Sequence, residues 1–275
     1  MFGFFLKKNF CNIWDNFFHT IFVNLPVILL SFLGYFFCSK MAGMREGTPF
    51  GGITFMIAVI ICCLVWGILF LAEGENAARI ANYDAPKFKL FLSQIPKCIK
   101  DGLLLGLCQA VLILAVLISI PYYFKIWMGV GETEGNLTGL LMMACVFWVV
   151  IIASLALQWV LPVRSLMHNN FRKCLKKSFI LFFDNPFFSI GVALVNLFNT
   201  ALAIFSMGIL DGPATMAITS TNALKLRLYK YDWLEVNPGL TKAQRKHVPW
   251  DDLLVKEKRL LGKRSFRSLI YPWKE

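Results

Sequence analysis

Charged residues are missing from long parts of this chain, and that absence determines its class. Five stretches of at least 23 residues contain no Asp, Glu, Lys or Arg: Asn16–Ser39, Gly47–Ala72, Gly102–Phe124, Gly135–Val163 and Asn185–Leu210. A helix rises about 1.5 Å per residue, so about 20 apolar residues cross the hydrocarbon core of a bilayer. With 57% hydrophobic residues, the chain is too apolar for an ordinary soluble domain. The sequence predicts an all-α polytopic membrane protein.

Motifs that would indicate an enzyme or a metal site are also missing. The sequence contains no HExxH, no glycine-rich phosphate loop, no Ser/His arrangement and no paired aspartates within a predicted span. Its eight cysteines form no CxxC pair, and its three histidines are scattered. We therefore expect no catalytic, cofactor-binding or metal-binding residues, and a protein that is not an enzyme.

Lys and Arg residues lie mainly in alternate connections between the uncharged stretches, and such residues favour the cytoplasmic side. Five crossings would leave the 13 basic residues from Lys225 to Lys274 outside. We therefore predict about six transmembrane helices. The sixth begins at the turn Asp211-Gly212-Pro213, has Gly212–Leu224 as its uncharged part, and uses the long side chains of Lys225 and Arg227 to reach the interface. This segment either spans fully or re-enters the membrane. Six spans place both termini and all but three of the 28 Lys and Arg residues in the cytoplasm.

The net charge of +12 indicates a lipid partner, because the basic residues flank the predicted spans. Anionic headgroups are the expected contact, and nucleic acid is not. Two basic connections, Phe91–Lys100 and Phe171–Phe179, place apolar residues every four positions with lysines between them. We expect two cytoplasmic amphipathic helices at the interface. Their matching place after a span indicates an internal repeat.

The chain divides into an integral membrane helical domain, residues 1–230, and a basic cytoplasmic tail, residues 231–275. Within the tail, Pro249–Leu261 has the pattern of a short amphipathic helix, with Asp251 and Asp252 near its start and Gly262 after its end. We expect this tail to dock on the membrane surface, and a protein partner is the alternative.

Polar side chains in the last two predicted spans are the candidates for a site: Asn196, Asn199, Thr200, Thr215, Thr219 and Asn222. Such groups are poorly placed against lipid, so they face other helices or a wet cavity. They either bond tightly packed helices together or line a solute pathway. At the inner end of the second span, Glu75 and Arg79 lie four residues apart and are predicted to form an ion pair.

Two short motifs carry a resemblance to a known family. Gly212-Pro-Ala-Thr-Met-Ala217 follows an apolar span and precedes a basic stretch, and the Phe-rich amphipathic segment Phe171–Phe183 precedes Asn185-Pro186 and another span. Over residues 70–235 the chain resembles the bacterial YesL-like family of integral membrane proteins. That resemblance implies a cell inner-membrane protein, often associated with carbohydrate uptake, and it assigns no catalytic residues.

Two functions from different classes follow as hypotheses. The first is a non-catalytic inner-membrane protein that serves as an accessory or scaffold of a solute uptake system, such as one for carbohydrates, together with a membrane-protein partner. The second is a small-solute transporter that uses the polar groups of its last two spans. The sequence names neither the solute nor the partner, and it leaves the oligomeric state open.

Overall fold

The computed structural model describes residues 1–45, 51–129, 135–209, 211–239, 241, 244–262 and 264, and all regular structure in these ranges is helical. In chain order the elements are α1 (Phe2–Asp15), α2 (Phe17–Arg45), α3 (Gly51–Ala72), α4 (Gly74–Ala81), α5 (Phe88–Leu114), the π-helical turn η1 (Ala115–Ser119), α6 (Ile120–Met128), α7 (Leu137–Leu157), α8 (Val160–Met167), α9 (Phe171–Asp184), α10 (Pro186–Phe205), α11 (Pro213–Val236), the 3-10 turn η2 (Gln244–Lys246), α12 (Trp250–Leu253) and α13 (Val255–Leu261). The predicted all-α class is confirmed.

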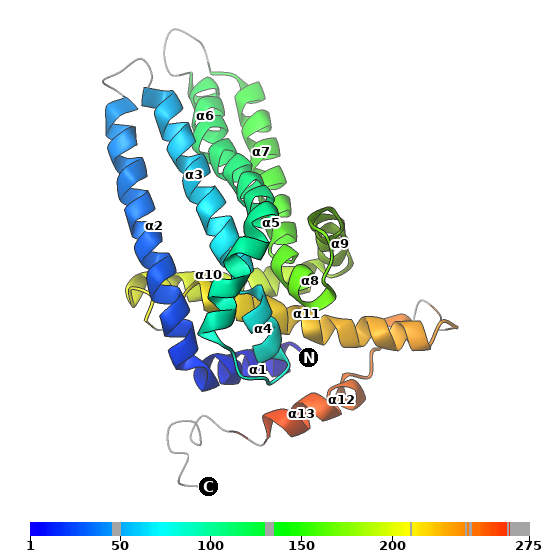
Figure 1. Ribbon diagram of the computed structural model, residues 1–275. Helices are drawn as coiled ribbons and strands as arrows, with labels where there is room; N and C mark the ends of the chain where they lie inside the picture. The colour runs from blue at the N-terminus through cyan, green and yellow to red at the C-terminus, as the bar shows by residue number, and fades with distance from the viewer. Residues whose placement is uncertain are drawn as a thin grey trace.

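Within these ranges, five helical segments are long and apolar enough to cross a membrane: Phe17–Met41, Gly52–Ala81, Phe88–Met128, Leu137–Met167 and Pro186–Phe205. The first four contain the helices that stand side by side as an upright bundle: α2, α3, α5 with α6, and α7 (Figure 1). The fifth, α10, runs across one end of that bundle (Figure 1). The protein is therefore a polytopic helical membrane protein, as predicted.

α11 is not a sixth span of this kind, and the predicted count of about six transmembrane helices is corrected to five by length and composition. The helix continues past Leu224 through Lys225, Arg227 and Lys230 to Val236, and it is not among the segments apolar enough to cross. It lies across the bundle beside α10 (Figure 1). Its short uncharged stretch reflects burial among other helices, which excludes charge as a bilayer does.

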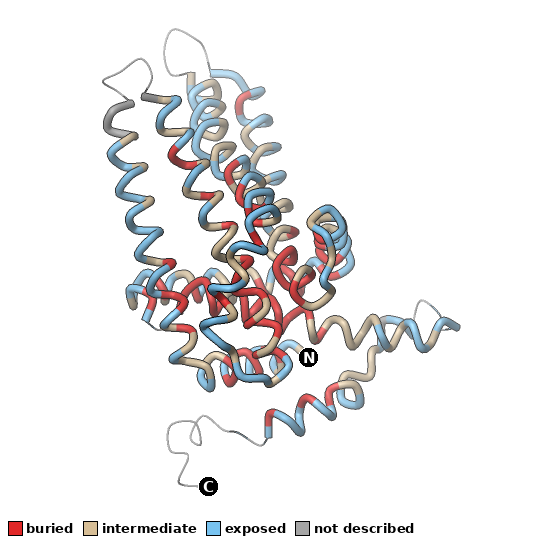
Figure 2. The backbone as a smooth tube through the Cα atoms, in the orientation of Figure 1, coloured by how far each residue is buried: buried red, intermediate tan, exposed pale blue. Residues whose placement is uncertain are grey.

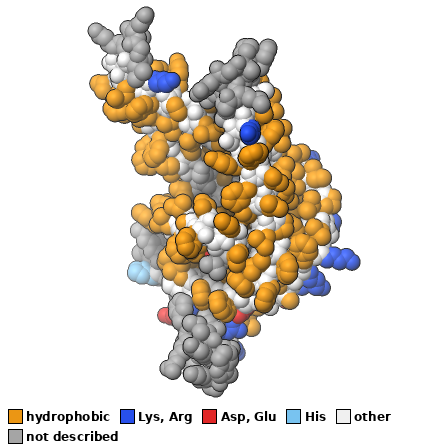
Figure 3. Space-filling view, turned by 90° about the vertical axis from the view of Figure 1, so that its left-hand side faces the viewer, with side chains coloured by type: hydrophobic (Ala, Val, Ile, Leu, Met, Phe, Trp, Pro, Cys, Tyr) orange, Lys and Arg blue, Asp and Glu red, His pale blue; other side chains and the backbone are white. Residues whose placement is uncertain are grey.

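Buried residues concentrate in a transverse layer, which we define as α1, α4, α8, α10 and α11 (Figure 2). In α11, every residue from Pro213 to Leu224 except Met216 is buried. The upright helices instead expose large apolar side chains: Phe18, Leu29 and Leu141 are 76%, 62% and 63% exposed. Hydrophobic side chains cover most of one such face (Figure 3). A surface of this kind suits hydrocarbon as the solvent.

α3 and α5 pack backbone against backbone through three glycines. A Cβ added to Gly106 would lie 2.4 Å from the carbonyl oxygen of Cys63, and one added to Gly102 would lie 2.5 Å from the Cα of Ile68. Gly67 faces the same contact from α3, where an added Cβ would lie 2.4 Å from the oxygen of Gly102. Small residues at such spacing let membrane helices approach closely. The two spans are thereby held at a fixed distance.

The two predicted interfacial helices take different forms. The segment Phe171–Phe179 lies in a separate helix, α9, whereas Phe91–Lys100 is the first part of α5, which continues past Pro96 into the bundle. The element order α3, α4, α5 matches α7, α8, α9, because each long helix is followed by an eight-residue helix and then by the amphipathic segment. α4 and α8 also pack on each other. This order is the one expected of an internal repeat. The two units differ at their ends, because α5 continues into the bundle whereas α9 ends at Asp184.

Candidate functional site

α11 is the central helix of the transverse layer because its first half is made of small and polar residues. Ala214, Ala217 and Ala223 are fully buried. At its N-terminus, the backbone N–H of Gly212 donates to Oγ1 of Thr215 (2.8 Å). The N–H of Ala214 donates to Oδ1 of Asn24 on α2 (2.9 Å). These bonds satisfy first-turn donors that a buried helix end would otherwise leave unpaired. The predicted site residue Thr215 is thus a helix cap.

Side-chain hydrogen bonds join α1, α10 and α11 in what we call the amide array: Asn9, Asn12, Asn199, Thr219 and Asn222. Asn12 Nδ2 donates to Asn222 Oδ1 (3.0 Å), and Asn222 Nδ2 donates to Asn9 Oδ1 (3.2 Å). Asn9 Nδ2 and Asn199 Nδ2 both donate to Oγ1 of Thr219, at 3.0 and 3.1 Å. All five side chains are buried. Buried polar groups are stable where they bond to one another, and here they fix the relative positions of three helices.

Of the six predicted site residues, three belong to the amide array: Asn199, Thr219 and Asn222. The others lie apart from it. Asn196 Nδ2 donates to Oγ of Ser220 (3.2 Å), and Thr200 Oγ1 donates to the carbonyl oxygen of Asn196 within α10 (2.8 Å). The interpretation as bonds between packed helices therefore describes Asn199, Thr219 and Asn222. It also describes the bond of Asn196 to Ser220, although Asn196 lies in addition on the wall of a cavity described below.

Sequence reasoning missed the contribution of α1, whose amphipathic pattern is inverted. Its polar residues Asn9 and Asn12 point into the protein, while Leu6, Phe10 and Trp14 on the other face are 41%, 39% and 48% exposed. A helix that sits in lipid and packs on a polar layer needs this arrangement. Two asparagines three residues apart among aromatic residues were the available signal.

Directly after the C-terminal end of α3, the carboxylate of Glu73 is buried against α2. His19 Nε2 lies 2.9 Å from Glu73 Oε1, and Asn76 Nδ2 donates to Glu73 Oε2 (3.3 Å). Glu73 is 2% exposed. The pair of an imidazole and a carboxylate joins the first two upright helices below their apolar parts.

The predicted ion pair between Glu75 and Arg79 is not formed within the described part of the chain. Arg79 Nε donates to the carbonyl oxygen of Ala85 (2.9 Å), and Glu75 Oε1 lies 3.8 Å from Nδ1 of His168. The short helix α4 ends at Ala81, two residues after Arg79. The following loop therefore brings the carbonyl oxygen of Ala85 within reach of the Arg79 guanidinium. The pairing rule assumes a continuous exposed helix, which is absent here.

A cluster that we call the tail clamp joins the C-terminal segment to the transverse layer: Lys8, Tyr83, Lys225, Tyr229 and Glu257. The carboxylate of Glu257, 1% exposed, forms ion pairs with Lys8 and Lys225. The hydroxyls of Tyr83 and Tyr229 donate to the same carboxylate at 2.8 and 2.7 Å. Tyr83 has a left-handed backbone (φ 64°), which turns the chain after α4. Four donors from three elements therefore hold one carboxylate of α13.

The charges of the clamp favour the ionised carboxylate. Burial alone raises the pKa of Glu257, but the charge of Lys8 and the hydrogen bonds from Lys225, Lys8 and Tyr229 outweigh it and lower that pKa to about 2. Burial, with the hydrogen bond to Glu257, also raises the pKa of Tyr83 and of Tyr229. Both hydroxyls therefore stay protonated and donate.

Acid should release the tail. An unfolded Glu has a pKa of about 4.3, above the folded value of about 2 for Glu257, so the clamp contributes its full stability above about pH 4.3 and loses it as pH falls toward 2. Pepsin cleavage within α13, measured relative to a free peptide of the same sequence, should be slow at pH 4.5 and accelerate between pH 4 and 2. A cleavage ratio independent of pH in that range would contradict the assignment.

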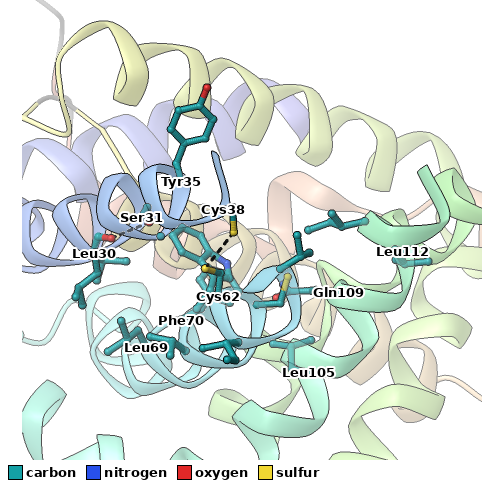
Figure 4. A pocket seen from close by; sticks show the side chains of 18 of the residues that line it. Leu30, Ser31, Tyr35, Cys38, Cys62, Leu69, Phe70, Leu105, Gln109 and Leu112 are labelled. Atoms are coloured by element: carbon teal, nitrogen blue, oxygen red, sulfur yellow. Dashed lines mark hydrogen bonds between the residues drawn. The ribbon is translucent and has the colours of Figure 1, made fainter. Parts of the chain in front are cut away.

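A cavity of about 850 Å³ lies between α2, α3 and α5, and its lining extends to α7, α10 and α11. Leu30, Cys62, Leu105 and other apolar side chains form most of its wall (Figure 4). Its polar lining residues are Ser31, Gln109, Ser154, Gln158, Asn196 and Ser220, besides Tyr35, whose hydroxyl points away from the other lining side chains (Figure 4). We call this cavity the bundle pocket. It reaches Asn196, one of the predicted site residues.

Comparison with protein-family models, curated proteins and solved structures finds no match to this chain. The class defined by its fold and surface is that of an all-α, multi-pass membrane protein.

Removing one amide of the array should destabilise the transverse layer. Asn222→Ala leaves the buried amides of Asn9 and Asn12 each without one partner, and we expect a loss of about 3 kcal/mol in the free energy of unfolding, since each unpaired group costs about 1–3 kcal/mol. Unfolding of the purified protein by sodium dodecyl sulfate measures this. The exposed Asn82 provides the control: Asn82→Ala should change stability by less than about 0.5 kcal/mol. Equal losses in the two variants would contradict a bonding role for the array.

Proposed function

We propose that this protein is a non-catalytic membrane protein of the cell inner membrane that serves as an accessory or scaffold subunit of a solute uptake system. The observation that carries this proposal is the amide array. A carrier would need polar side chains that are free to bind a solute. Here the side chains of Asn199, Thr219 and Asn222 form hydrogen bonds with one another and with residues of α1. The resemblance of Gly212–Ala217 to the YesL-like motif favours a carbohydrate system.

A rigid inner platform supports the same proposal. The transverse layer is joined to α2 through Asn24 and Glu73, and to the C-terminal segment through the tail clamp. A carrier must rearrange around its solute, and such rearrangement would break many buried polar bonds at once. A subunit that holds a partner in place benefits from the opposite property.

The orientation proposed for this subunit has both terminal segments in the cytoplasm. α1 and α13 lie at the same end of the bundle and are joined by Lys8 and Glu257 (Figure 1). Basic connections favour the cytoplasmic side. Trypsin added to sealed right-side-out cells should leave Lys256 and Lys258 uncleaved, and should cleave there in inverted vesicles. Cleavage of intact cells at these residues would reverse the orientation.

Purification from native membranes tests the scaffold. The full chain, tagged at its C-terminus and extracted into lipid nanodiscs without detergent, should retain a membrane transport subunit at constant stoichiometry. Asn222→Ala should reduce that retention, and Asn82→Ala should not. A homogeneous preparation that contains only this chain would overturn the proposal.

The bundle pocket favours a second candidate, a small-solute transporter, because it reaches Asn196 from the side of the bundle. Counterflow in proteoliposomes distinguishes the two functions. The scaffold predicts no counterflow over a panel of sugars, polyols and amino acids. Counterflow that is abolished by Asn196→Leu, and retained by Gln94→Leu on the half-buried inner part of α5, would decide for transport.

A further inference from the structure

We propose that the bundle pocket binds one neutral membrane lipid that carries a free hydroxyl group, of the diacylglycerol type. Its volume of about 850 Å³ falls within the roughly 300–1,000 Å³ typical of small-molecule sites. The pocket lies between helices that stand in the bilayer, so lipid is the molecule that reaches it at the highest concentration.

The lining excludes a charged headgroup. Among its lining residues there is no Asp, Glu, Lys, Arg or His. An ion buried without a partner costs several kcal/mol, so a phosphate would not enter so apolar a site. Val27, Leu30, Leu69 and Leu112 offer contacts to an acyl chain instead.

Two amide side chains on the pocket wall have oxygen atoms that a hydrogen-bonding ligand could satisfy. Asn196 Oδ1 and Gln109 Oε1 are buried and have no hydrogen-bond partner within the described part of the chain. A buried acceptor without a donor costs about 1–3 kcal/mol. Both residues line the pocket, and a lipid hydroxyl there can donate to an amide oxygen and accept from an amide nitrogen. An ester or ether lipid without a hydroxyl could not satisfy the oxygens.

The shape of the pocket orients the lipid. Asn196 and Ser220 come from α10 and α11, which lie across the bundle, while Leu30, Cys62 and Leu112 come from upright helices (Figures 1 and 4). The hydroxyl end therefore lies at the transverse layer, with Gln109 of α5 on the upright wall, and the two acyl chains extend between α2, α3 and α5. A lipid of the leaflet on that side has this same direction, with its chain toward the bilayer centre.

The test uses the full chain in phosphatidylcholine vesicles that contain a photoactivatable diacylglycerol. Crosslinks should concentrate on pocket residues. Unlabelled dioleoylglycerol should compete about three- to tenfold better than its methyl ether, since one hydrogen bond contributes about 0.5–1.5 kcal/mol and 1.4 kcal/mol is tenfold. Equal competition by the two compounds would show that bulk lipid fills the pocket, and would overturn the proposal.

Variants separate the hydroxyl contact from simple filling. Asn196→Leu and Gln109→Leu replace each amide by an apolar side chain of similar size, and each should reduce crosslinking by about three- to tenfold. Gln94→Leu makes the same change in α5 outside the pocket and should have no effect. Ser31→Trp should block the pocket and abolish crosslinking. Detergent unfolding of each variant confirms that it is folded, and unchanged crosslinking in folded Asn196→Leu and Gln109→Leu would refute the hydroxyl contact.

Discussion

Gly106→Ala in α5 is expected to lower the free energy of unfolding by about 3 kcal/mol, the upper end of the usual cost of overpacking. The added Cβ would lie 2.4 Å from the carbonyl oxygen of Cys63 and 2.6 Å from the Cα of Leu64. Both obstacles are backbone atoms, so no side-chain rotation relieves the contact and the two helices must separate. Unfolding of the purified protein in sodium dodecyl sulfate, followed by tryptophan fluorescence, measures the loss.

A glycine near the start of the neighbouring helix α3 provides the control. A Cβ added to Gly52 in α3 meets no atom within 4 Å. Gly52→Ala should therefore leave stability unchanged or raise it by up to about 1 kcal/mol through helix propensity. Equal behaviour of Gly52→Ala and Gly106→Ala would mean that α3 and α5 are not in backbone contact.

The glycine contact also bears on the bundle pocket. Cys63 and Leu105, which flank this contact, also line the pocket. Separation of α3 from α5 in Gly106→Ala would therefore change the pocket wall, whereas the transverse layer would keep its own bonds. Loss of lipid crosslinking in Gly106→Ala with an intact tail clamp is the expected combination.

The membrane class could be predicted from the sequence, because it depends on the length of uncharged stretches alone. Hydrocarbon excludes charge over about 20 residues, and four of the five uncharged stretches correspond to upright helices. The transverse helices could not be separated from spans by this rule. α10 is apolar enough to be a span, and its contacts with α11, α7 and α9 in the folded chain place it across the bundle.

For each contact of α11 with α1 in the candidate site, the sequence pointed to one of the two bonded residues but not to its partner. Asn199, Thr219 and Asn222 stood out because polar residues are rare in apolar helices. Their partners Asn9 and Asn12 did not, because an asparagine near the N-terminus of a chain is ordinary in any sequence. Glu257 was equally inconspicuous. In a tail with several charges, nothing in the sequence distinguishes the one carboxylate that lies between Lys8 and Lys225. Residues 240, 242, 243, 263 and 265–275 of the predicted tail lie outside the described residues.

Glu257→Ala should release α13 from the transverse layer. The substitution leaves Lys8, which is 0% exposed, without its carboxylate, and breaking a buried pair in this way costs about 3–5 kcal/mol. Because α13 has seven residues, it would not stay helical once undocked. Hydrogen exchange of the amides from Val255 to Leu261 should therefore accelerate about 100-fold or more.

Two further variants determine whether the buried charge, and not the loss of packing, causes that release. Asp251→Ala removes a carboxylate from the same tail whose partner is Lys258, but this pair is exposed and should contribute at most about 1 kcal/mol. The double variant Lys8→Met with Glu257→Met removes both charges while keeping similar volumes. Replacing a buried pair by apolar residues is often neutral, so exchange in α13 should return most of the way to the native rate. If the double variant exchanges as fast as Glu257→Ala, then relief of the unpaired Lys8 charge does not restore docking, and the bonds that Glu257 accepts from Lys225 and the two tyrosines hold the tail.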